Sequence, residues 1–327
     1  MKAILQPAYG SADVLELADV DRPTIGDDDV LVRVHAAAVC KGDVHLLTGR
    51  PYAIRLGFGL RRPSRRIAGQ DIAGTVEAVG KNVTTLAPGA EVFGQVTGGF
   101  AEYVAAPADR LAPKPSNLTF EQAAAVPDSG MTALQGLRDA GRLQPGQRVL
   151  INGASGGVGT SAVQIAKALG AEVTAVCSTR HVARVASLGA DHVIDYTRDD
   201  FVRLGPVHDL MFDLVGNRPL RDCRAVLKPH GIYVSSSGSA GGDDWLGPIW
   251  WLLKVKLANA FVSQTTLALL ARPKQADLLF LRSLVESGKL TPVIEHRFSL
   301  EDARAAVHHV AAGHAQGKTV IAVAAGA

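Results

Sequence analysis

INGASGGVGTSAVQIAKALG, at residues 151–170, decides the fold of this chain. An apolar run enters a glycine-rich turn, and an amphipathic segment of helical period leaves it directly. Glycines let such a turn be tight, and the free N–H groups at the helix start bind a pyrophosphate. The alternative is a turn that serves only tight packing. The turn residues predicted to contact a dinucleotide are Gly153, Ser155, Gly156, Gly157 and Val158.

Strand and helix patterns alternate on both sides of this turn. NLTFEQAAAV opens the region, with Thr119 as the expected N-cap and Gln122 completing a capping box. After the turn, AEVTAVCS, HVIDY, HDLMFDLVG and GIYVSSSG have the character of strands, whereas TRHVARVASLG and RPLRDCRAVLKPHG have that of helices. The alternation predicts βαβ units and a doubly wound parallel sheet between residues 119 and 282.

The strand after the turn indicates which nicotinamide cofactor binds. In this fold, an acid near the end of that strand holds the ribose 2′-hydroxyl of NAD. Here the strand ends in Ser178, Thr179 and Arg180, without an acid. The two hydroxyls can donate hydrogen bonds and Arg180 can pair with a 2′-phosphate, so the sequence predicts NADPH. Arg180 could instead be a solvated residue, and Tyr196 lies either near the adenosine or in the core.

Residues 1–118 have a different sequence pattern from the region that follows. Short segments rich in valine and alanine, such as VLVRVHAAAV and IAGTVEAVG, are separated by turn sequences such as TIGDDD and APGA. This pattern predicts an antiparallel, barrel-like domain. Residues 283–327 read as helix, strand, helix and strand, and we expect them to return to that domain. The fold class is therefore α/β.

The composition, net charge and number of cysteines exclude several classes of protein. Of 327 residues, 47% are hydrophobic and 20% are charged, which fits a globular chain. A net charge of +3 is too small to indicate a nucleic-acid partner. Three scattered cysteines and a beginning unlike a signal peptide favour a reducing, cytoplasmic setting.

The most apolar stretch is WLGPIWWLLKVKLANAFVSQTTLALL, at residues 245–270. Lys254 and Lys256 interrupt it, and no run reaches the ~18 uncharged residues that a membrane helix needs. We interpret it as a buried or subunit-facing helical region and expect no membrane insertion. The alternative is a helix that lies on a membrane surface.

Motifs along the whole chain resemble one family. In order they are GSADVLELADVDRP, VLVRVHAAAV, GQDIAGTVEAVGKNV, PGAEVFG, FAEYVAAP, AAAVPDSGMTALQGL, GASGGVG, SLGADHVIDY and GKTVI. Together they resemble the zinc-free, quinone oxidoreductase-like branch of the medium-chain dehydrogenase/reductase superfamily. The resemblance implies a GroES-like catalytic domain at 1–118 with 283–327, a Rossmann domain at 119–282, an active site between them and a homodimer. It also implies that the nicotinamide end is bordered by Thr132, Val215, Ser237 and Gly238.

Other members of the superfamily hold a catalytic zinc ion, which raises the question of a metal here. Cys40, in AVCKGDVHLLTG, matches their first cysteine, but Gln70 stands where they have a histidine and Asp128 where they have another cysteine. Cys40, Asp71 and Asp128 form a thin set for zinc, which prefers thiolate and imidazole ligands. We predict no metal ion, with Cys40 as either a pocket-lining thiol or an inert buried residue.

Without a metal, a conjugated acceptor is easier to reduce, because conjugation carries the charge to an oxygen that hydrogen bonds can stabilise. We predict hydride transfer from NADPH to a quinone or to the β-carbon of an enone, with a polyketide-like substrate and coupled ring closure left open. The alternatives are a zinc-dependent alcohol dehydrogenase and a non-enzymatic NADPH-binding protein. Tyr52 resembles by location the catalytic tyrosine of related enoyl reductases, or it is a packing residue. The candidate catalytic residues are Tyr52, His45, Cys40 and Asp128.

Overall fold

The computed structural model describes residues 1–236, 262–313 and 316–323, and these group into two compact units. Unit 1 contains residues 1–131, 273–288 and 292–327, and unit 2 contains residues 132–272 and 289–291. Helix α9 (Gln275–Glu286) therefore groups with unit 1, whereas the sequence suggested a border at 282/283. The expected contacts Ser237 and Gly238 lie outside the described residues.

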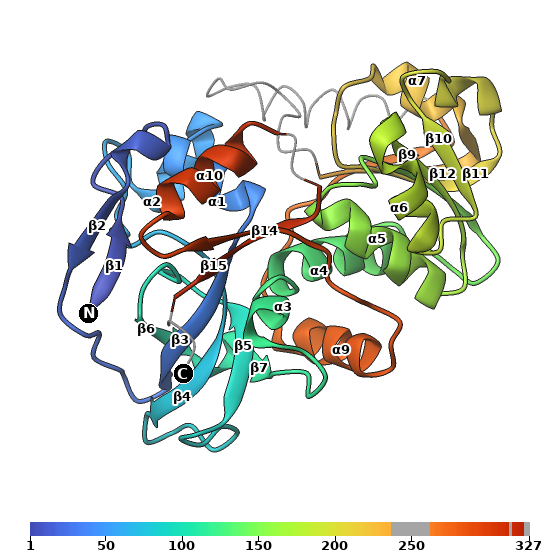
Figure 1. Ribbon diagram of the computed structural model, residues 1–327. Helices are drawn as coiled ribbons and strands as arrows, with labels where there is room; N and C mark the ends of the chain where they lie inside the picture. Colours follow the sequence, from blue (N-terminus) through green and yellow to red (C-terminus); the bar gives the residue numbers. More distant parts are fainter. Residues whose placement is uncertain (237–261, 314–315, 324–327) are drawn as a thin grey trace. The chain divides into compact units, whose positions relative to one another are not determined.

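Unit 1 is built on a seven-stranded sheet in the order β14-β15-β3-β4-β5-β7, with β6 paired to β3 (Figure 1). All of its strand pairs are antiparallel except β14 with β15. Val30, Val32 and Val34 alternate with less buried residues along β3, because successive side chains of a strand point to opposite faces. The strands are β3 (Asp29–Val39), β4 (Asp71–Val79), β5 (Glu91–Gln95), β6 (Tyr103–Pro107), β7 (Leu111–Pro113), β14 (Ile294–Ser299) and β15 (Lys318–Ala322), with β1 (Lys2–Leu5) and β2 (Glu16–Asp19) paired separately.

Short helices fill the connections of unit 1. The helices are α1 (Lys41–Thr48), α2 (Arg55–Phe58), α3 (Phe120–Ala124), α4 (Pro127–Leu134), which crosses into unit 2, and α10 (Ala303–Ala311). The capping box predicted at the start of α3 is confirmed: the amide of Gln122 donates to the Thr119 hydroxyl at 3.2 Å, and the amide of Thr119 donates to Gln122 Oε1 at 3.0 Å. The tail has the predicted order of helix, strand, helix and strand, and β15 pairs with β3.

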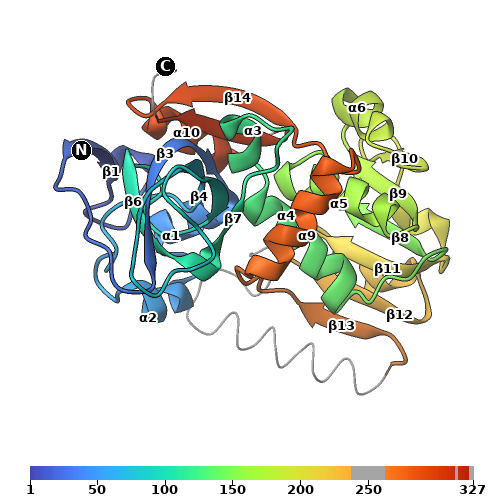
Figure 2. The ribbon, with the colours of Figure 1, turned by 90° about the horizontal axis from the view of Figure 1, so that it is seen from below.

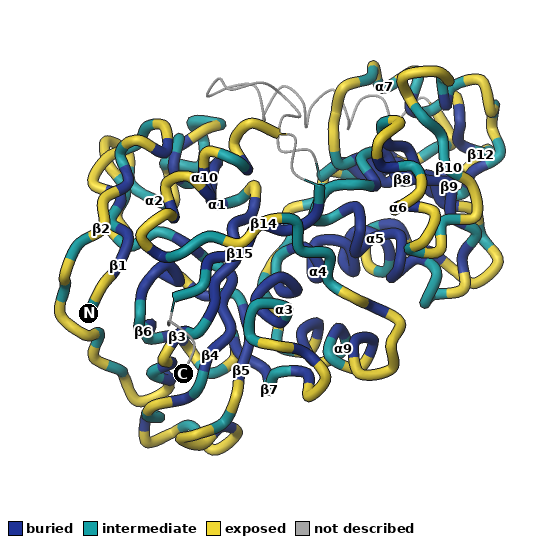
Figure 3. Tube along the Cα trace, in the orientation of Figure 1, coloured by how far each residue is buried: buried dark blue, intermediate teal, exposed yellow. Residues whose placement is uncertain are grey.

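Unit 2 is built on a six-stranded parallel sheet in the order β10-β9-β8-β11-β12-β13 (Figure 2). The predicted parallel sheet is therefore confirmed. Helix α5 is buried from Gly159 to Ala166, which places it at the centre of the unit's core (Figure 3). The elements are β8 (Arg148–Asn152), α5 (Gly157–Ala168), β9 (Glu172–Cys177), α6 (Val182–Ser187), β10 (His192–Asp195), β11 (His208–Asp213), α7 (Leu220–Ala225), β12 (Leu227–Ser235) and β13 (Thr265–Ala268).

Two helix predictions are wrong in part. The helix expected over residues 218–231 ends at Ala225, and β12 begins at Leu227. The helix expected over residues 245–270 is a strand at its described end, because residues 265–268 pair with β12 and bury Thr266. Sheet hydrogen bonds outweigh local propensity in both segments. Among the helices that the structure describes, none has both the length and the apolar character needed to cross a membrane.

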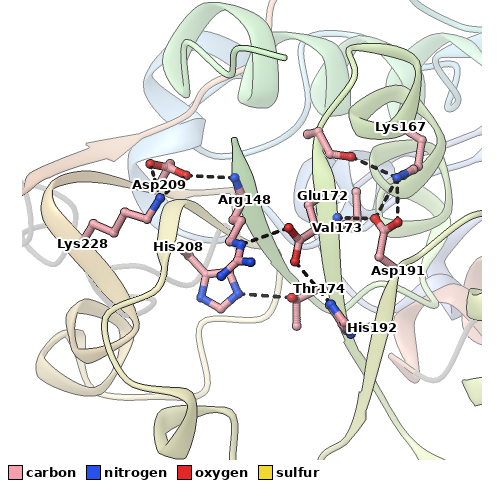
Figure 4. Close-up of polar contacts among 11 residues, drawn as sticks. Arg148, Lys167, Glu172, Val173, Thr174, Asp191, His192, His208, Asp209 and Lys228 are labelled. Carbon is pink, nitrogen blue, oxygen red and sulfur yellow. Dashed lines mark hydrogen bonds and ion pairs between the residues drawn. The ribbon is translucent and has the colours of Figure 1, made fainter. Parts of the chain in front are cut away.

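Charged side chains lie along the edge of the parallel sheet at which its strands begin (Figure 4). Arg148 Nε donates to Glu172 Oε2 at 2.9 Å, and His192 Nε2 lies 3.3 Å from Glu172 Oε1. The amide of Arg148 donates to Asp209 at 2.9 Å. Solvent screens the half-exposed ion pairs of Glu172 with Arg148 and His192, so they add little to stability. The glycine-rich turn lies at the opposite edge, where the strands end and where ligands bind in such sheets.

Candidate active site

The glycine-rich turn has a geometry that only glycine allows at two positions. Gly153 follows β8 with a φ of +88°, in the left-handed region that favours glycine. A Cβ on Gly159 would lie 2.1 Å from the carbonyl oxygen of Gly153. The helix α5 begins at Gly157, and its N-cap, Gly156, has no side chain to occupy the helix start. The first amides of α5 are thus placed as in a phosphate-binding turn.

Asp213, which the sequence analysis missed, holds the neighbouring loop. It is completely buried at the end of β11, and Oδ1 accepts hydrogen bonds from Asn152 Nδ2 at 2.9 Å and from the amides of Val215 and Gly216 at 3.0 Å each. Its other oxygen accepts the hydroxyl of Tyr233 at 2.7 Å. An aspartate at the end of a buried apolar run was the available signal. It fixes the position of Val215, the residue expected at the nicotinamide end.

The region expected to bind the 2′-phosphate contains an acid from another strand. Thr179 donates its hydroxyl to Asp195 Oδ2 at 2.6 Å, and Asp195 is the last residue of β10. The hydrogen bond from Thr179 lowers the pKa of Asp195 below its ordinary value. Arg180 is exposed, and Tyr196 is 60% exposed, which excludes a core position for this tyrosine.

Unit 1 contains a buried polar cluster formed by Cys40, Asp43, Gln70, Asp71, Asp128 and Lys318. Its centre is an ion pair: Lys318 Nζ lies 3.0 Å from Asp71 Oδ2, and both side chains are at most 5% exposed. Asp71 Oδ1 accepts the amide of Asp128 at 3.1 Å, which joins β4 to the first turn of α4. Gln95 Nε2 donates to Asp128 Oδ1 at 3.1 Å.

Cys40 belongs to the other half of this cluster, at the start of α1. Its amide donates to Asp43 Oδ2 at 2.8 Å, and Gln70 Nε2 donates to Asp43 Oδ1 at 3.1 Å. The same Gln70 nitrogen lies 3.8 Å from Cys40 Sγ. Gln70 therefore takes part in the cluster as a hydrogen-bond donor to a carboxylate and a thiol.

The pKa values of Cys40, Asp71 and Lys318 are all raised, so these groups of the cluster hold their protons more tightly than usual. Burial raises the pKa of Cys40 well above its ordinary value, and Asp128 and Asp43 raise it further, so the thiol keeps its proton. Burial raises the pKa of Asp71 to about 8 against the opposing charge of Lys318. Burial alone would lower the pKa of Lys318, but Asp71, Cys40 and Asp128 outweigh it and raise that pKa above its ordinary value.

These residues do not fit a catalytic zinc ion. Zinc needs thiolate, imidazole or carboxylate ligands that converge on one point, but this cluster offers no imidazole, Gln70 donates its amide to Asp43, and Asp71 is bound to Lys318. Within the part of the chain that the structure describes, the only converging set of three such ligands is Glu295, His296 and His309, outside this cluster. The sequence analysis missed Lys318, although a lysine opening the apolar run of GKTVI was a visible signal.

The other two catalytic candidates, His45 and Tyr52, lie near the cluster in sequence, but they contact Arg50 and Arg55 respectively. His45 is on α1, and its Nδ1 lies 3.0 Å from the carbonyl oxygen of Arg50. The ring of Tyr52 lies 4.7 Å from the guanidinium carbon of Arg55. A pocket of unit 1 borders the cluster at Asp43 and Gln70, and neither His45 nor Tyr52 is among its described lining residues. Its other walls include Tyr9, Phe58, Ile67, Arg65 and Phe100.

The chain matches known proteins along most of its length. Residues 26–116 match the family model of the alcohol dehydrogenase GroES-like domain, and residues 188–321 match that of the zinc-binding dehydrogenases. The 2-methylene-furan-3-one reductase of Solanum lycopersicum is 33% identical to this chain, and the match covers 98% of this chain and 79% of that protein. The chloroplastic NADPH-dependent alkenal/one oxidoreductase of Arabidopsis thaliana is 31% identical, with coverage of 98% and 79%.

A solved structure agrees with these relatives. The quinone oxidoreductase of Coxiella burnetii has a TM-score of 0.85 and 31% identity, and the match covers 99% of each chain. The two folds, the glycine-rich turn and these relatives define an oxidoreductase with a nicotinamide cofactor. The chain belongs to the medium-chain dehydrogenase/reductase superfamily, in its quinone oxidoreductase-like branch. The GroES-like and Rossmann folds implied by the resemblance are thereby confirmed.

Proposed function

We propose that this protein is an NADPH-dependent reductase that acts on a quinone or on the β-carbon of an α,β-unsaturated carbonyl, without zinc. The observation that carries the proposal is the Lys318–Asp71 ion pair within the buried polar cluster. An ammonium group balances the carboxylates there, and the donor set is wrong for a Lewis-acid metal. The relatives named as enone and quinone reductases support the same substrate class.

The residues of each unit have separate tasks in this reaction. When bound, the cofactor supplies a hydride. The amides at the start of α5 hold its pyrophosphate, and Asp213 fixes the loop of Val215 through the hydrogen bonds described above. In unit 1 the pocket beside Asp43 and Gln70 accepts the apolar substrate, because Phe58, Ile67 and Phe100 line it.

A conjugated acceptor gains a hydride at carbon and a proton afterwards, so the protein must stabilise a developing oxyanion and deliver a proton. We propose Tyr52 and His45 as the hydrogen-bond or proton donors; neither lines the pocket beside Asp43 and Gln70, so this role requires that the reacting end of the substrate extends beyond that pocket. Cys40 holds its proton because burial raises the pKa of its thiol, so it donates rather than attacks as a thiolate. Asp128 is held by Gln95 and orients the cluster.

A substrate panel tests the proposal. Metal-stripped, tag-free protein is mixed with NADPH and a series of quinones, enones and saturated ketones, and the loss of NADPH absorbance is followed. We expect turnover of the conjugated acceptors alone, unaffected by chelator. Reduction of saturated ketones that depends on added zinc would favour an alcohol dehydrogenase, and cofactor binding without any turnover would favour a non-enzymatic role; either result contradicts the proposal.

Arg180→Ala tests the preference for NADPH. We expect the KM for NADPH to rise about tenfold or more, because hydrogen bonds to a charged group contribute about 1.5–3 kcal/mol, whereas the KM for NADH should not change. Arg221→Ala is the matched control, since this arginine on α7 is 87% exposed and pairs with the adjacent Asp222 at 3.2 Å. Equal affinities of the parent protein for NADPH and NADH would refute the preference. The cytoplasmic location and the homodimer stay predictions.

A further inference from the structure

Glu295, His296 and His309 form a cluster of metal-ligating side chains on unit 1, between β14 and α10. One ligand atom from each of the three residues lies within 4.8 Å of the others. His309 Nε2 is 3.2 Å from Glu295 Oε2, and His296 Nε2 is 3.6 Å from Glu295 Oε1. Helix α10 lies beside β14 and β15, so residues 14 positions apart in sequence meet here (Figure 1).

A β-bulge explains how two adjacent residues of one strand reach the same point. Neighbouring side chains of a regular strand point to opposite faces, so Glu295 and His296 should diverge. The pairing of β14 with β15 shifts between Ile294, which faces Lys318, and His296, which faces Thr319. Glu295 is thus the extra residue, and a bulge re-aims side chains in this way. The bulge creates the convergence that a regular strand would not give.

The spacing suits a transition-metal ion. Ligand atoms that surround an ion tetrahedrally at about 2.0–2.1 Å lie about 3.3 Å from one another. This value falls between the nitrogen–oxygen distances of 3.2 Å and 3.6 Å found here. Two imidazoles and a carboxylate are a ligand set that zinc accepts with a fourth position left for water. The imidazoles face the two oxygens of one carboxylate, and their rings meet edge to face with centroids 4.5 Å apart.

The surroundings hold the carboxylate in place and leave one side open. The amide of Gln316 donates to Glu295 Oε2 at 2.5 Å and so orients the carboxylate, as outer-shell hydrogen bonds orient metal ligands. The side chain of Glu295 is 12% exposed, whereas that of His296 is 49% exposed. An ion and its water ligand can therefore enter from the side of His296.

We propose that Glu295, His296 and His309 bind a divalent transition-metal ion such as Zn²⁺, and that this ion ties β14 to α10. The site is separate from the buried polar cluster and does not depend on the proposed reductase activity. Zinc found in purified protein would then come from this surface site rather than from Cys40.

Titration of chelator-treated, tag-free protein with ZnCl₂, followed by calorimetry, tests this proposal. We expect one equivalent to bind and to raise the melting temperature, because an ion that binds only the folded state stabilises it. His296→Gln and His309→Gln should each weaken binding by at least about tenfold, the lower limit for loss of even an outer-shell partner. His308→Gln is the matched control, since this neighbouring histidine pairs with Asp13 at 3.0 Å, outside the proposed ligand set.

Two outcomes would overturn the proposal: no binding by the parent protein, which would leave Glu295 as a simple ion-pair partner, or unchanged binding by both His296→Gln and His309→Gln. His296 is half-exposed, so its replacement should leave the fold intact even where a change at Glu295 would not. Circular dichroism of each variant before titration separates loss of a ligand from loss of structure.

Discussion

Replacement of Lys318 by methionine is expected to lower the free energy of unfolding by about 3–5 kcal/mol at about pH 9, where Asp71 is charged in the parent protein, because it leaves this buried acid without its partner. The pair is completely enclosed, with Nζ 3.0 Å from Asp71 Oδ2, so water cannot replace the lost ammonium. Chemical denaturation of parent and variant, monitored by circular dichroism, measures the difference. Methionine has a similar volume, so the loss reports the charge rather than a cavity.

Two further variants make this result specific. The double variant Asp71→Asn with Lys318→Met should recover most of the lost stability, because it removes both charges and keeps an acceptor for the amide of Asp128. Lys81→Met breaks an exposed pair with Asp27 of 2.7 Å and should change stability by less than about 1 kcal/mol. Similar effects at Lys318 and Lys81 would contradict the importance assigned to burial.

The same variant should have a characteristic dependence on pH. Burial raises the pKa of Asp71 to about 8, so the folded state binds this proton more tightly than the unfolded chain does. The contribution of Asp71 to the free energy of unfolding therefore falls as pH rises from about 4 towards 8. Lys318 is protonated in both states over this range. Methionine removes the charge that opposes the shift and so raises the folded-state pKa of Asp71 further. The gap in the free energy of unfolding between variant and parent should therefore stay nearly constant below about pH 7 and widen as pH rises through about 8.

Gly159→Ala is expected to lower kcat/KM with NADPH by on the order of 100-fold, the effect of displacing a positioning group by roughly 1 Å. The new Cβ would lie 2.1 Å from the Gly153 carbonyl oxygen and 2.7 Å from backbone atoms of Ala154. Backbone atoms cannot rotate aside, so the turn must open and its amides leave their places. The melting temperature should fall as well, because α5 is at the centre of the core.

Two glycines provide the controls for that variant. Gly156→Ala has no neighbour closer than 3.7 Å, so the fold should persist while the close approach of a pyrophosphate is hindered. Gly57→Ala has nothing within 4 Å and should leave both stability and activity unchanged. If Gly159→Ala kept the parent affinity for NADPH, measured by fluorescence quenching, the assignment of this turn to the cofactor would be wrong.

Local patterns were sufficient for most of the fold. The glycine-rich turn and the alternation around it predicted the parallel sheet of unit 2, and the Thr119–Gln122 pattern predicted the start of α3. Such signals lie within a few residues of one another, and the chemistry of each residue acts locally. The strand β13 was missed because its hydrogen bonds are made to β12, a partner that sequence periodicity does not reveal.

The sequence by itself determined the family, the two folds and the place of the glycine-rich turn, because each depends on short-range patterns of glycine, apolar and capping residues. Only the tertiary structure decided which charges meet: Lys318 with Asp71, 247 positions apart, and Thr179 with Asp195 from a neighbouring strand. It also decided that the bulge beside Ile294 turns Glu295 and His296 toward His309. Electrostatic partners are chosen by distance in space, and burial then sets how strongly each pair matters.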